Sequence, residues 1–494
     1  MTRKRKTRQK AEFGDFQTPE DLAGQVCLLL AQRGLQPRSV LEPTCGKGSF
    51  LAAALDSFPS IGGAVGVEIN RDHVSAAKLT VARKGTKNWV EVRQDDFFST
   101  DWRKILQCLD DPLLIIGNPP WVTNAELGAL GSSNLPDKSN FQNYRGIDAI
   151  TGKGNFDISE WMLIKSFEWM NGRRAVLAML CKTTVARKVL LHAWRTGQSI
   201  GQSNIYLIDT VKHFGAAVDG CLLVVESSLS TRNLECQAHD SLQHEQPSAV
   251  WGCREDELVA DVRAFDRWKH LDGKERYKWR SGIKHDCSKV MEFLDDAEEF
   301  RNGMGELAHL EPDYLYPMLK SADLANGPQV RPKRWMLVTQ RTIGQDTNEI
   351  KEKAPLTWQY LEKHGDLLDS RGSAIYRKRA RFSVFGIGEY SFAPWKVAIS
   401  GFYKKLEFKV IGPYRGLPIV LDDTCYFVPC ESQHEAELVA FLLNSDIAQE
   451  FFSALIFWDA KRPITATVLR RLDLLSLAKE LSLEKELRKH LKRI

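Results

Sequence analysis

The chain has 494 residues, of which 43% are hydrophobic and 27% charged, proportions typical of a globular protein with two or three domains. Its formal net charge of +5 is too small to indicate nucleic-acid binding by itself. The sequence has no apolar run long enough to span a bilayer and no signal-peptide pattern, so we expect a cytoplasmic protein without a membrane partner.

Basic residues crowd the start of the chain. Met1–Lys10 contains no acidic residue, and its cations are Arg3, Lys4, Arg5, Lys6, Arg8 and Lys10. Residues 1–12 are therefore predicted to form a flexible basic tail, which is either simply solvated or tracks the phosphates of a nucleic acid. A helix is expected next, because Thr18 can cap it and Pro19 suits its first position.

A glycine-containing turn follows. Ser39–Phe50 indicates a buried strand, a turn with Gly46 and Gly48, and the start of a helix. The two glycines would let the backbone approach a ligand closely, next to N–H groups at the helix start. Glu42 ends the strand and could hold an ammonium group.

Two further predicted strands end in acidic residues. Ala64–Asn70 carries Glu68 about twenty residues after the glycines, where a carboxylate can accept both hydroxyls of a ribose. Trp89–Phe98 alternates in polarity and then reaches Asp95 and Asp96.

The fourth predicted strand, Leu113–Gly117, opens into the tetrapeptide Asn118-Pro119-Pro120-Trp121. The two prolines fix the backbone, so the Asn118 side chain and the Pro119 carbonyl are expected to point into the crevice beyond the strand. Both oxygens could accept hydrogen bonds from an exocyclic amine, and Trp121 offers a flat face for its ring. The alternative is a proline-terminated strand with Trp121 in the core.

These segments together resemble the gamma-class DNA adenine-N6 methyltransferases, the modification methylases of restriction–modification systems that use S-adenosylmethionine. Residues 118–121 match the (N/D/S)PP(Y/F/W) motif, and residues 42–50 and 16–19 resemble two earlier motifs of that family in the gamma-class order. The resemblance covers about residues 13–228. It implies a class I methyltransferase domain, Rossmann-like, with a mostly parallel seven-stranded sheet, followed by a mixed α+β target-recognition domain.

The resemblance also implies roles for particular residues. Glu68 would bind the cofactor ribose, Asp96 or its neighbour Asp95 the adenine amine of the cofactor, and Phe97 the adenine ring. The implied cofactor-binding set is Thr18, Pro19, Glu42, Pro43, Cys45, Gly46, Gly48, Glu68, Ile69, Asp96, Phe97 and Asn118. The implied catalytic set is Asn118, Pro119, Pro120, Trp121 and Phe214.

The rest of the first half is expected to complete the sheet. Residues 122–155 are polar with little periodicity and predict a loop that either closes over the substrate or is a disordered insertion. A helix is expected from Asn155, with strands at 175–180 and 205–209 and a hairpin ending at 221–225. Phe214 matches the family's aromatic residue that stacks on an extruded base; the alternative is a core side chain.

In the second half, residues 229–250 are predicted to be a linker because they are rich in Ser, Thr, Gln and His. Residues 251–494 are predicted to be the DNA target-recognition domain, ending in helices. Cations interleaved with aromatic residues favour DNA binding by Arg377, Lys378, Arg379 and Arg381, and by Lys461 and Arg462. A solvated basic face is the alternative at each place.

No metal is expected. Ten cysteines occur without a CxxC pair, and the spacing of Cys236, His239, His244 and Cys253 matches no zinc pattern. The expected partners are double-stranded DNA, bound by a monomer, and a restriction endonuclease or another defence-system subunit. Three alternatives stay open: the same chemistry on RNA or on a protein glutamine, a catalytically silent DNA-binding subunit, and a fused restriction nuclease, which no nuclease motif supports.

Overall fold

The computed structural model describes residues 16–86, 88–122, 157–228, 232–273, 275–296, 299–326, 331–460 and 462–491. The predicted tail at 1–12 and nearly all of the predicted loop at 122–155 lie outside these residues. The chain divides into two compact units, of which the first ends at Val262 and the second begins at Arg263. None of the helices in the described ranges is long and apolar enough to cross a membrane.

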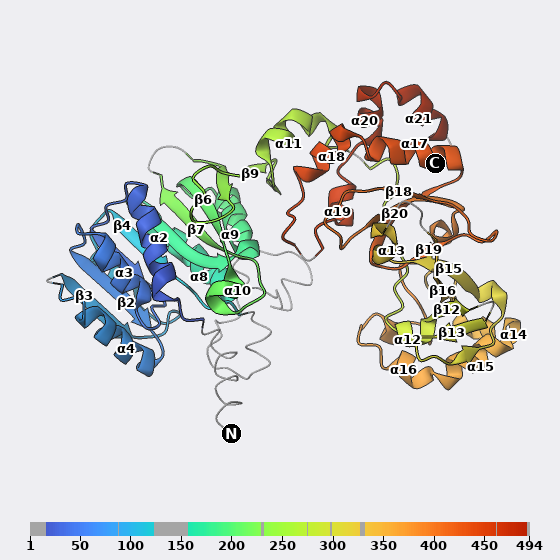
Figure 1. Ribbon diagram of the computed structural model, residues 1–494, viewed down its shortest axis with the longest axis horizontal. Coiled ribbons are helices and arrows are strands. Elements are labelled where there is room, and N and C mark those ends of the chain that lie inside the picture. The colour runs from blue at the N-terminus through green and yellow to red at the C-terminus, as the bar shows by residue number, and fades with distance from the viewer. Residues whose placement is uncertain are drawn as a thin grey trace. The chain divides into compact units, whose positions relative to one another are not determined.

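A ten-stranded sheet forms the centre of the first unit, in the order β10-β9-β8-β6-β7-β5-β4-β1-β2-β3 (Figure 1). β7 runs antiparallel to both of its neighbours, β5 and β6, whereas β1 to β5 pair in parallel. The class I methyltransferase sheet, with one strand reversed between two others, is therefore confirmed, but β8, β9 and β10 extend it beyond the predicted seven strands. The strands are β1 (Ser39–Glu42), β2 (Gly63–Glu68), β3 (Trp89–Gln94), β4 (Leu113–Gly117), β5 (Ala175–Lys182), β6 (Ile200–Ile208), β7 (Gly220–Ser227), β8 (Glu235–His239), β9 (Ala249–Arg254) and β10 (Glu257–Val259).

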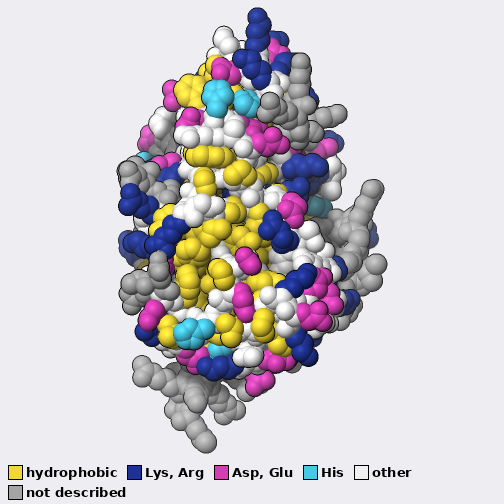
Figure 2. All heavy atoms as spheres, turned by 90° about the vertical axis from the view of Figure 1, so that its right-hand side faces the viewer, with side chains coloured by type: hydrophobic (Ala, Val, Ile, Leu, Met, Phe, Trp, Pro, Cys, Tyr) yellow, Lys and Arg dark blue, Asp and Glu magenta, His cyan; other side chains and the backbone are white. Residues whose placement is uncertain are grey.

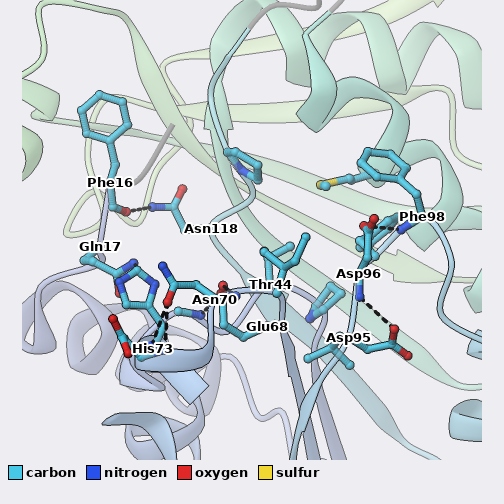
Figure 3. Close-up of a pocket in the computed structure, with 18 residues that line it drawn as sticks. Phe16, Gln17, Thr44, Glu68, Asn70, His73, Asp95, Asp96, Phe98 and Asn118 are labelled. Carbon is cyan, nitrogen blue, oxygen red and sulfur yellow. Dashed lines mark hydrogen bonds between the residues drawn. The ribbon is translucent and has the colours of Figure 1, made fainter. Parts of the chain in front are cut away.

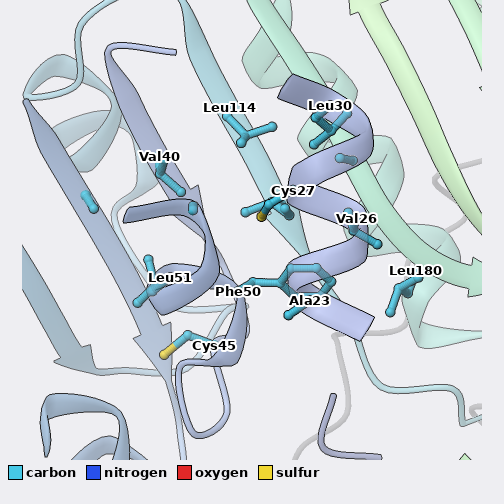
Figure 4. Packing of buried hydrophobic residues seen from close by; sticks show 14 of the residues in the cluster. Ala23, Val26, Cys27, Leu30, Val40, Cys45, Phe50, Leu51, Leu114 and Leu180 are labelled. Atoms are coloured by element: carbon cyan, nitrogen blue, oxygen red, sulfur yellow. The ribbon is translucent and has the colours of Figure 1, made fainter. Parts of the chain in front are cut away.

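Apolar side chains join helices to this sheet. Leu114 of β4 and Leu180 of β5 meet α2, while Phe50 and Leu51 bring α3 into the same buried cluster (Figure 4). The α2 residues that face the sheet recur at helical spacing, as expected for a helix with one buried side. The helices of the unit are α2 (Glu20–Gln32), α3 (Ser49–Ser57), α4 (Arg71–Ala82), α5 (Trp102–Gln107), α8 (Ile158–Met170), α9 (Thr183–Thr196) and α10 (Thr210–Phe214).

The structure corrects several predicted boundaries. α2 begins at Glu20 with Pro19 at its N-cap and without a side-chain cap, so Thr18 does not cap it as predicted. α8 begins at Ile158 rather than Asn155, because Asp157 caps it by accepting the Ser159 N–H.

The predicted linker at 229–250 is also wrong. It contains β8, which pairs in parallel with β6, and it leads into β9. Cys236 and Ala238 are buried, and their alternation with polar neighbours is the pattern of a strand. The stretch is mostly polar, and the alternating pattern of β8 is only five residues long, so composition alone suggested a linker.

The second unit contains two sheets, and the predicted mixed α+β architecture is confirmed. The strand order is β11-β20-β17-β18 in one sheet and β14-β13-β12-β16-β15-β19 in the other. The strands are β11 (Arg280–Ser281), β12 (Glu292–Asp296), β13 (Glu299–Asn302), β14 (Leu307–Ala308), β15 (Leu315–Leu319), β16 (Arg334–Leu337), β17 (Trp395–Ser400), β18 (Lys409–Ile411), β19 (Val420–Leu421) and β20 (Cys425–Cys430).

Helices flank these sheets and end the described chain, as predicted for the carboxyl-terminal region. The longer ones are α11 (Val262–Trp268), α15 (Pro355–Lys363), α17 (Gln433–Leu443), α18 (Asp446–Ser453), α20 (Leu474–Glu480) and α21 (Glu484–Leu491). The shorter ones include α12 (Ser288–Met291), α13 (Ser321–Ala325), α14 (Ile350–Lys353), α16 (Gly365–Asp369), α19 (Ala466–Leu469) and the 3₁₀ turns η4 (Tyr376–Lys378) and η5 (Glu389–Phe392).

Candidate active site

A pocket of about 300 Å³ lies where four strands of the first sheet end (Figure 3). Thr44 follows β1, Asn70 follows β2, Asp96 follows β3 and Asn118 follows β4. The carboxyl edge of a parallel sheet is where α/β folds bind ligands. The structure thus brings together side chains that are far apart in the sequence.

The predicted site residues divide into two groups. Those that line the pocket are Pro43, Gly46, Glu68, Ile69, Asp96, Phe97, Asn118 and Pro120, and Asp95 lies among them. Those outside its lining are Thr18, Pro19, Glu42, Cys45, Gly48, Pro119, Trp121 and Phe214. The lining residues for which the sequence predicted no role are Phe16, Gln17, Thr44, Val67, Asn70, Asp72, His73, Phe98 and Met162.

Glu68 is held rigidly at one wall of the pocket. Its Oε2 accepts the Gly46 N–H at 2.9 Å, and its Oε1 accepts the Asn70 N–H at 2.8 Å. The carboxylate is therefore oriented before a ligand arrives.

Gly46 and Gly48 are both required, for different reasons. Both have positive φ, +52° and +81° respectively. A Cβ on Gly46 would lie 2.6 Å from Gln17 Oε1 at the pocket, whereas a Cβ on Gly48 would lie 3.2 Å from the Cβ of Ala77 in α4. The prediction that Gly48 makes room for a ligand is therefore corrected: its space is taken by helix packing.

Glu42 is almost fully enclosed, with 3% of its surface exposed. Its Oε2 accepts the Leu51 N–H at 3.1 Å, in the first turn of α3. Burial raises the pKa of this carboxyl well above its ordinary value, and the nearby Glu68 charge raises it further. Its contact with an ammonium group stays a prediction.

Asp95 and Asp96 stand side by side after β3 but turn in different directions (Figure 3). The Asp96 carboxylate accepts the Phe98 N–H at 3.0 Å, and that of Asp95 accepts the Asp96 N–H at 2.9 Å. Asp96 is half-buried whereas Asp95 is exposed. Asp96 is thus the better enclosed of the two predicted partners for a ligand amine.

Phe97 belongs to a cluster of aromatic rings that backs the pocket. Its side chain is 5% exposed, and its ring centroid lies 4.9–5.8 Å from its neighbours in the cluster, Phe98, Trp102, Trp161 and Trp169. Phe98 is half-buried and lines the pocket too. The apolar wall predicted from Phe97 is therefore made by two rings.

Asn118 presents an acceptor without a partner. Its Nδ2 donates to the Phe16 carbonyl at 2.9 Å, which fixes the amide (Figure 3). Its Oδ1 is buried, and no hydrogen-bond donor reaches it from the described residues. A buried unpaired acceptor costs about 1–3 kcal/mol, so this atom is suited to a donor that a ligand supplies. The Thr44 hydroxyl is in the same state on the pocket wall.

Three aromatic rings, those of Phe16, Trp121 and Phe214, contact one another. Trp121 and Phe214 meet nearly edge to face, with centroids 5.5 Å apart, and Phe16 lies 6.2 and 6.1 Å from them. Phe214 ends α10 and is half-buried, whereas Trp121 is 5% exposed. The predicted pair is thus brought together, although Phe16 was missed.

The predicted DNA-binding cations differ in their surroundings. Arg377, Lys378 and Arg379 are exposed, and none forms an ion pair with the described residues. Arg381 instead pairs with Asp369 at 2.8 Å. Arg462 donates to the Asp423 carbonyl at 3.1 Å and packs over Phe402, and Lys461 lies outside the described residues. Arg381 and Arg462 are therefore engaged within the protein.

Comparison with known proteins agrees with this geometry. A family model described as N-6 DNA Methylase matches residues 2–182. The Type II methyltransferase M.NspV of Nostoc sp. (strain ATCC 29411 / PCC 7524) is 45% identical over 471 residues, which cover 95% of this chain and 98% of that protein. The Type II methyltransferase M.CvrRI of Paramecium bursaria Chlorella virus XZ-6E is 33% identical over 24% of this chain and 26% of its own.

Among solved structures, the Type IIL restriction-modification enzyme MmeI in complex with DNA aligns with a TM-score of 0.55 and 14% identity. The alignment covers 93% of this chain and 64% of that longer one, so it supports the fold of both units. The resemblance predicted from the motifs is confirmed by the extent of the match to M.NspV. The chain belongs to the family of N-6 DNA methylases.

Proposed function

We propose that this protein transfers a methyl group from S-adenosylmethionine to the exocyclic N6 amine of an adenine in double-stranded DNA, as a modification enzyme that protects sites from a restriction endonuclease. The observation that carries the proposal is the unpaired Oδ1 of Asn118, a residue that lines the pocket and whose amide is bonded to the Phe16 carbonyl.

The pocket suits S-adenosylmethionine chemically. Glu68 offers two oriented carboxylate oxygens for ribose hydroxyls, and Asp96 offers an acceptor for the adenine amine. Ile69, Phe97 and Phe98 supply apolar walls for a ring. When bound, S-adenosylmethionine supplies an electrophilic methyl group on its sulfonium.

Asn118 and Pro119 would orient the target amine. The amide oxygen and the backbone carbonyl accept its two hydrogens, which directs the nitrogen lone pair along the line of attack. Because the Phe16 carbonyl already fixes the Asn118 amide, little reorganisation is needed when the amine arrives. Positioning and fixed dipoles of this kind lower barriers effectively.

The target adenine must leave the base stack, since its amine cannot be reached inside a duplex. Extrusion costs a few kcal/mol, and stacking on an aromatic side chain returns about 1–3 kcal/mol per base. The half-buried Phe214 would stack on the base, and Trp121, which belongs to the buried core, packs against Phe214 and would support it. The second unit, with exposed cations at Arg377, Lys378 and Arg379, would grip the duplex.

Surface charge alone does not define that grip. Acidic and basic side chains interleave on the face seen in Figure 2, around an area where hydrophobic side chains gather. The candidates for phosphate contacts are therefore individual exposed cations without an acidic partner among the described residues, namely Arg377, Lys378 and Arg379.

The test is Asn118→Ala. The variant is expected to keep its affinity for S-adenosylmethionine, measured by calorimetry, and to lose methyl transfer by on the order of a hundredfold or more. Asn171→Ala changes an exposed asparagine at the end of α8 and is the matched control. Modified-base sequencing of DNA from an expressing host locates the site. Near-normal transfer by Asn118→Ala would rule the mechanism out.

A further inference from the structure

Arg341 and Glu389 form an exposed ion pair on the second unit. Arg341 Nη2 lies 3.2 Å from Glu389 Oε2, and Nε lies 3.5 Å from Oε1. The two side chains are 51% and 70% exposed. Arg341 follows β16, and Glu389 opens the turn η5. An exposed ion pair of this kind contributes little to the stability of the fold, so stability does not explain why Arg341 and Glu389 are paired.

The Arg341 guanidinium stacks on the ring of Phe392. Its central carbon lies 4.1 Å from the centroid of the Phe392 ring, which is 8% exposed and packs 5.0 Å from the ring of Tyr316. Arg341 Nη1 also donates to the Tyr316 hydroxyl at 3.4 Å. Stacking on an aromatic face together with three polar contacts fixes the plane of the guanidinium.

The remaining donors form a pair. A guanidinium has five N–H groups, and the contacts above engage one on Nε, one on Nη1 and one on Nη2. One N–H on each Nη is left, so the guanidinium keeps one donor on each of its two terminal nitrogens. The two terminal nitrogens of an arginine can donate to the O6 and N7 acceptors of guanine in the major groove, and a neighbouring carboxylate can accept from the N4 donor of its cytosine.

Free cations lie next to this pair. The backbone N–H of Arg341 donates to Gln345 Oε1 at 2.8 Å and so closes the turn that follows Arg341. A Cβ on Gly344 in that turn would lie 3.6 Å from Arg379 Nη1, so the turn adjoins η4 with its exposed cations. The turn that follows Arg341 therefore adjoins exposed cations that pair with no described acid, where phosphates would be bound.

We propose that Arg341 reads a guanine of the recognition sequence in the major groove, with Glu389 and Phe392 as the residues that position it. This inference rests on the proposed function and deepens it by naming a base and its reader. Glu389→Gln should keep the fold yet loosen the guanidinium, and so weaken the preference for that guanine by less than loss of Arg341 does.

The experiment uses the full chain and duplex oligonucleotides that carry the methylated site. Each guanine of the site is replaced in turn by 7-deazaguanine, which lacks the N7 acceptor, and kcat/KM for methylation is measured. The wild type should lose about tenfold or more at one guanine. Arg341→Ala should be slower on the normal site and insensitive to that one replacement, with unchanged affinity for S-adenosylmethionine.

Arg415→Ala is the matched control, because Arg415 also pairs with an acid, Asp295 at 2.8 Å, and lies 5.3 Å from a tyrosine ring. It should keep the sensitivity of the wild type. A recognition site without guanine, or an Arg341→Ala enzyme still sensitive at every guanine, would overturn the assignment. So would a loss that is equal for all sequences and lowers the salt slope, the mark of a phosphate contact. Absence of DNA methylation by the wild type would instead refute the proposed function.

Discussion

Lys396 in β17 is a cation enclosed in the second unit, 1% exposed. Its Nζ donates to the Ala393 carbonyl at 2.5 Å, and the Phe427 ring lies 6.0 Å away. Burial lowers the pKa of Lys396 from 10.5 to about 7. The charged form is therefore costly in the folded protein near neutral pH.

The folded pKa of Lys396 lies below the unfolded one, which sets the sign of a pH effect. Between about pH 7 and pH 10.5 the unfolded chain binds a proton at this side chain that the folded chain does not. Stability should therefore rise with pH through this window, by at most about 1.4 kcal/mol per pH unit from this group. Lys396→Met should be more stable than the wild type at pH 7 and lose this part of the rise.

Urea unfolding of the full chain at pH 7 and pH 9 checks the prediction, with Lys404→Met as an exposed control that should change neither value. Equal pH dependence in wild type and Lys396→Met would show that the ammonium group is solvated.

For single residues, the sequence predicted which side chains carry functional groups better than it predicted their hydrogen-bond partners. Asn118 was singled out because prolines fix the chain around it, and the structure leaves its oxygen open. Nothing in the local sequence shows that the Phe16 carbonyl, 102 residues away, would orient its amide. Likewise, Glu42 follows from the strand-end pattern, but its bond to Leu51 depends on how α3 packs.

At the scale of elements, the start of α3 leads to a prediction about stability and cofactor affinity. Gly48 caps this helix in the left-handed region, and α4 packs against it. Gly48→Ala should destabilise the protein by more than the roughly 1–2 kcal/mol that left-handed backbone costs an alanine. Affinity of the folded protein for S-adenosylmethionine should change little, whereas Gly46→Ala should weaken it, because a Cβ there displaces Gln17 at the pocket.

Thermal unfolding and calorimetry separate the two effects. Gly85→Ala isolates the backbone cost, since Gly85 has φ +59° and nothing within 4 Å of its Cβ position. If Gly48→Ala costs no more than Gly85→Ala, the packing against α4 has been overestimated.

Elements were predictable where their pattern was long. The strands β1, β2, β4 and β5 follow apolar runs that parallel pairing makes nearly continuous, whereas the edge strand β3 alternates in polarity. Each was predicted within a few residues. β8 was missed because only Cys236 and Ala238 of its five residues alternate inward before His239. The start of α2 was misplaced because Pro19 fits both the cap and the first turn.

At the scale of the whole molecule, three of the predicted DNA-binding cations, Arg377, Lys378 and Arg379, are exposed and have no acidic partner among the described residues. Reversing Arg377, Lys378 and Arg379 to Glu should weaken DNA binding and lower the salt slope by about one unit for each lost phosphate contact. Affinity for S-adenosylmethionine should stay as in the wild type, because every predicted cofactor residue lies in the first unit.

Binding titrations at several salt concentrations measure both quantities. The same reversal at Lys351 on α14 is the control, because it alters net charge at another exposed place in the unit. An unchanged slope in the triple variant would mean that this turn is only solvated. The variant does not include Arg381, because reversing its charge would also break its ion pair with Asp369, and a loss of DNA affinity would then have two explanations.

The division into two units was predicted, but its position was not. A chain cut at Ser228 would lose β8, β9 and β10 and expose the edge of β6, which invites aggregation. The boundary at Val262 depends on the pairing of β8 with β6, which the amino-acid composition of this stretch does not reveal.

The aromatic cluster behind the pocket also makes the molecule its own optical probe. Trp102 and Trp169 lie 4.5 Å apart and tilted by 36°, close enough for their excited states to couple, and Phe97 links them to the pocket wall. A ligand that stacks on that wall would alter their emission and their near-ultraviolet circular dichroism. Occupancy of the site could thus be followed without a label, in the unmodified protein and while DNA is being turned over.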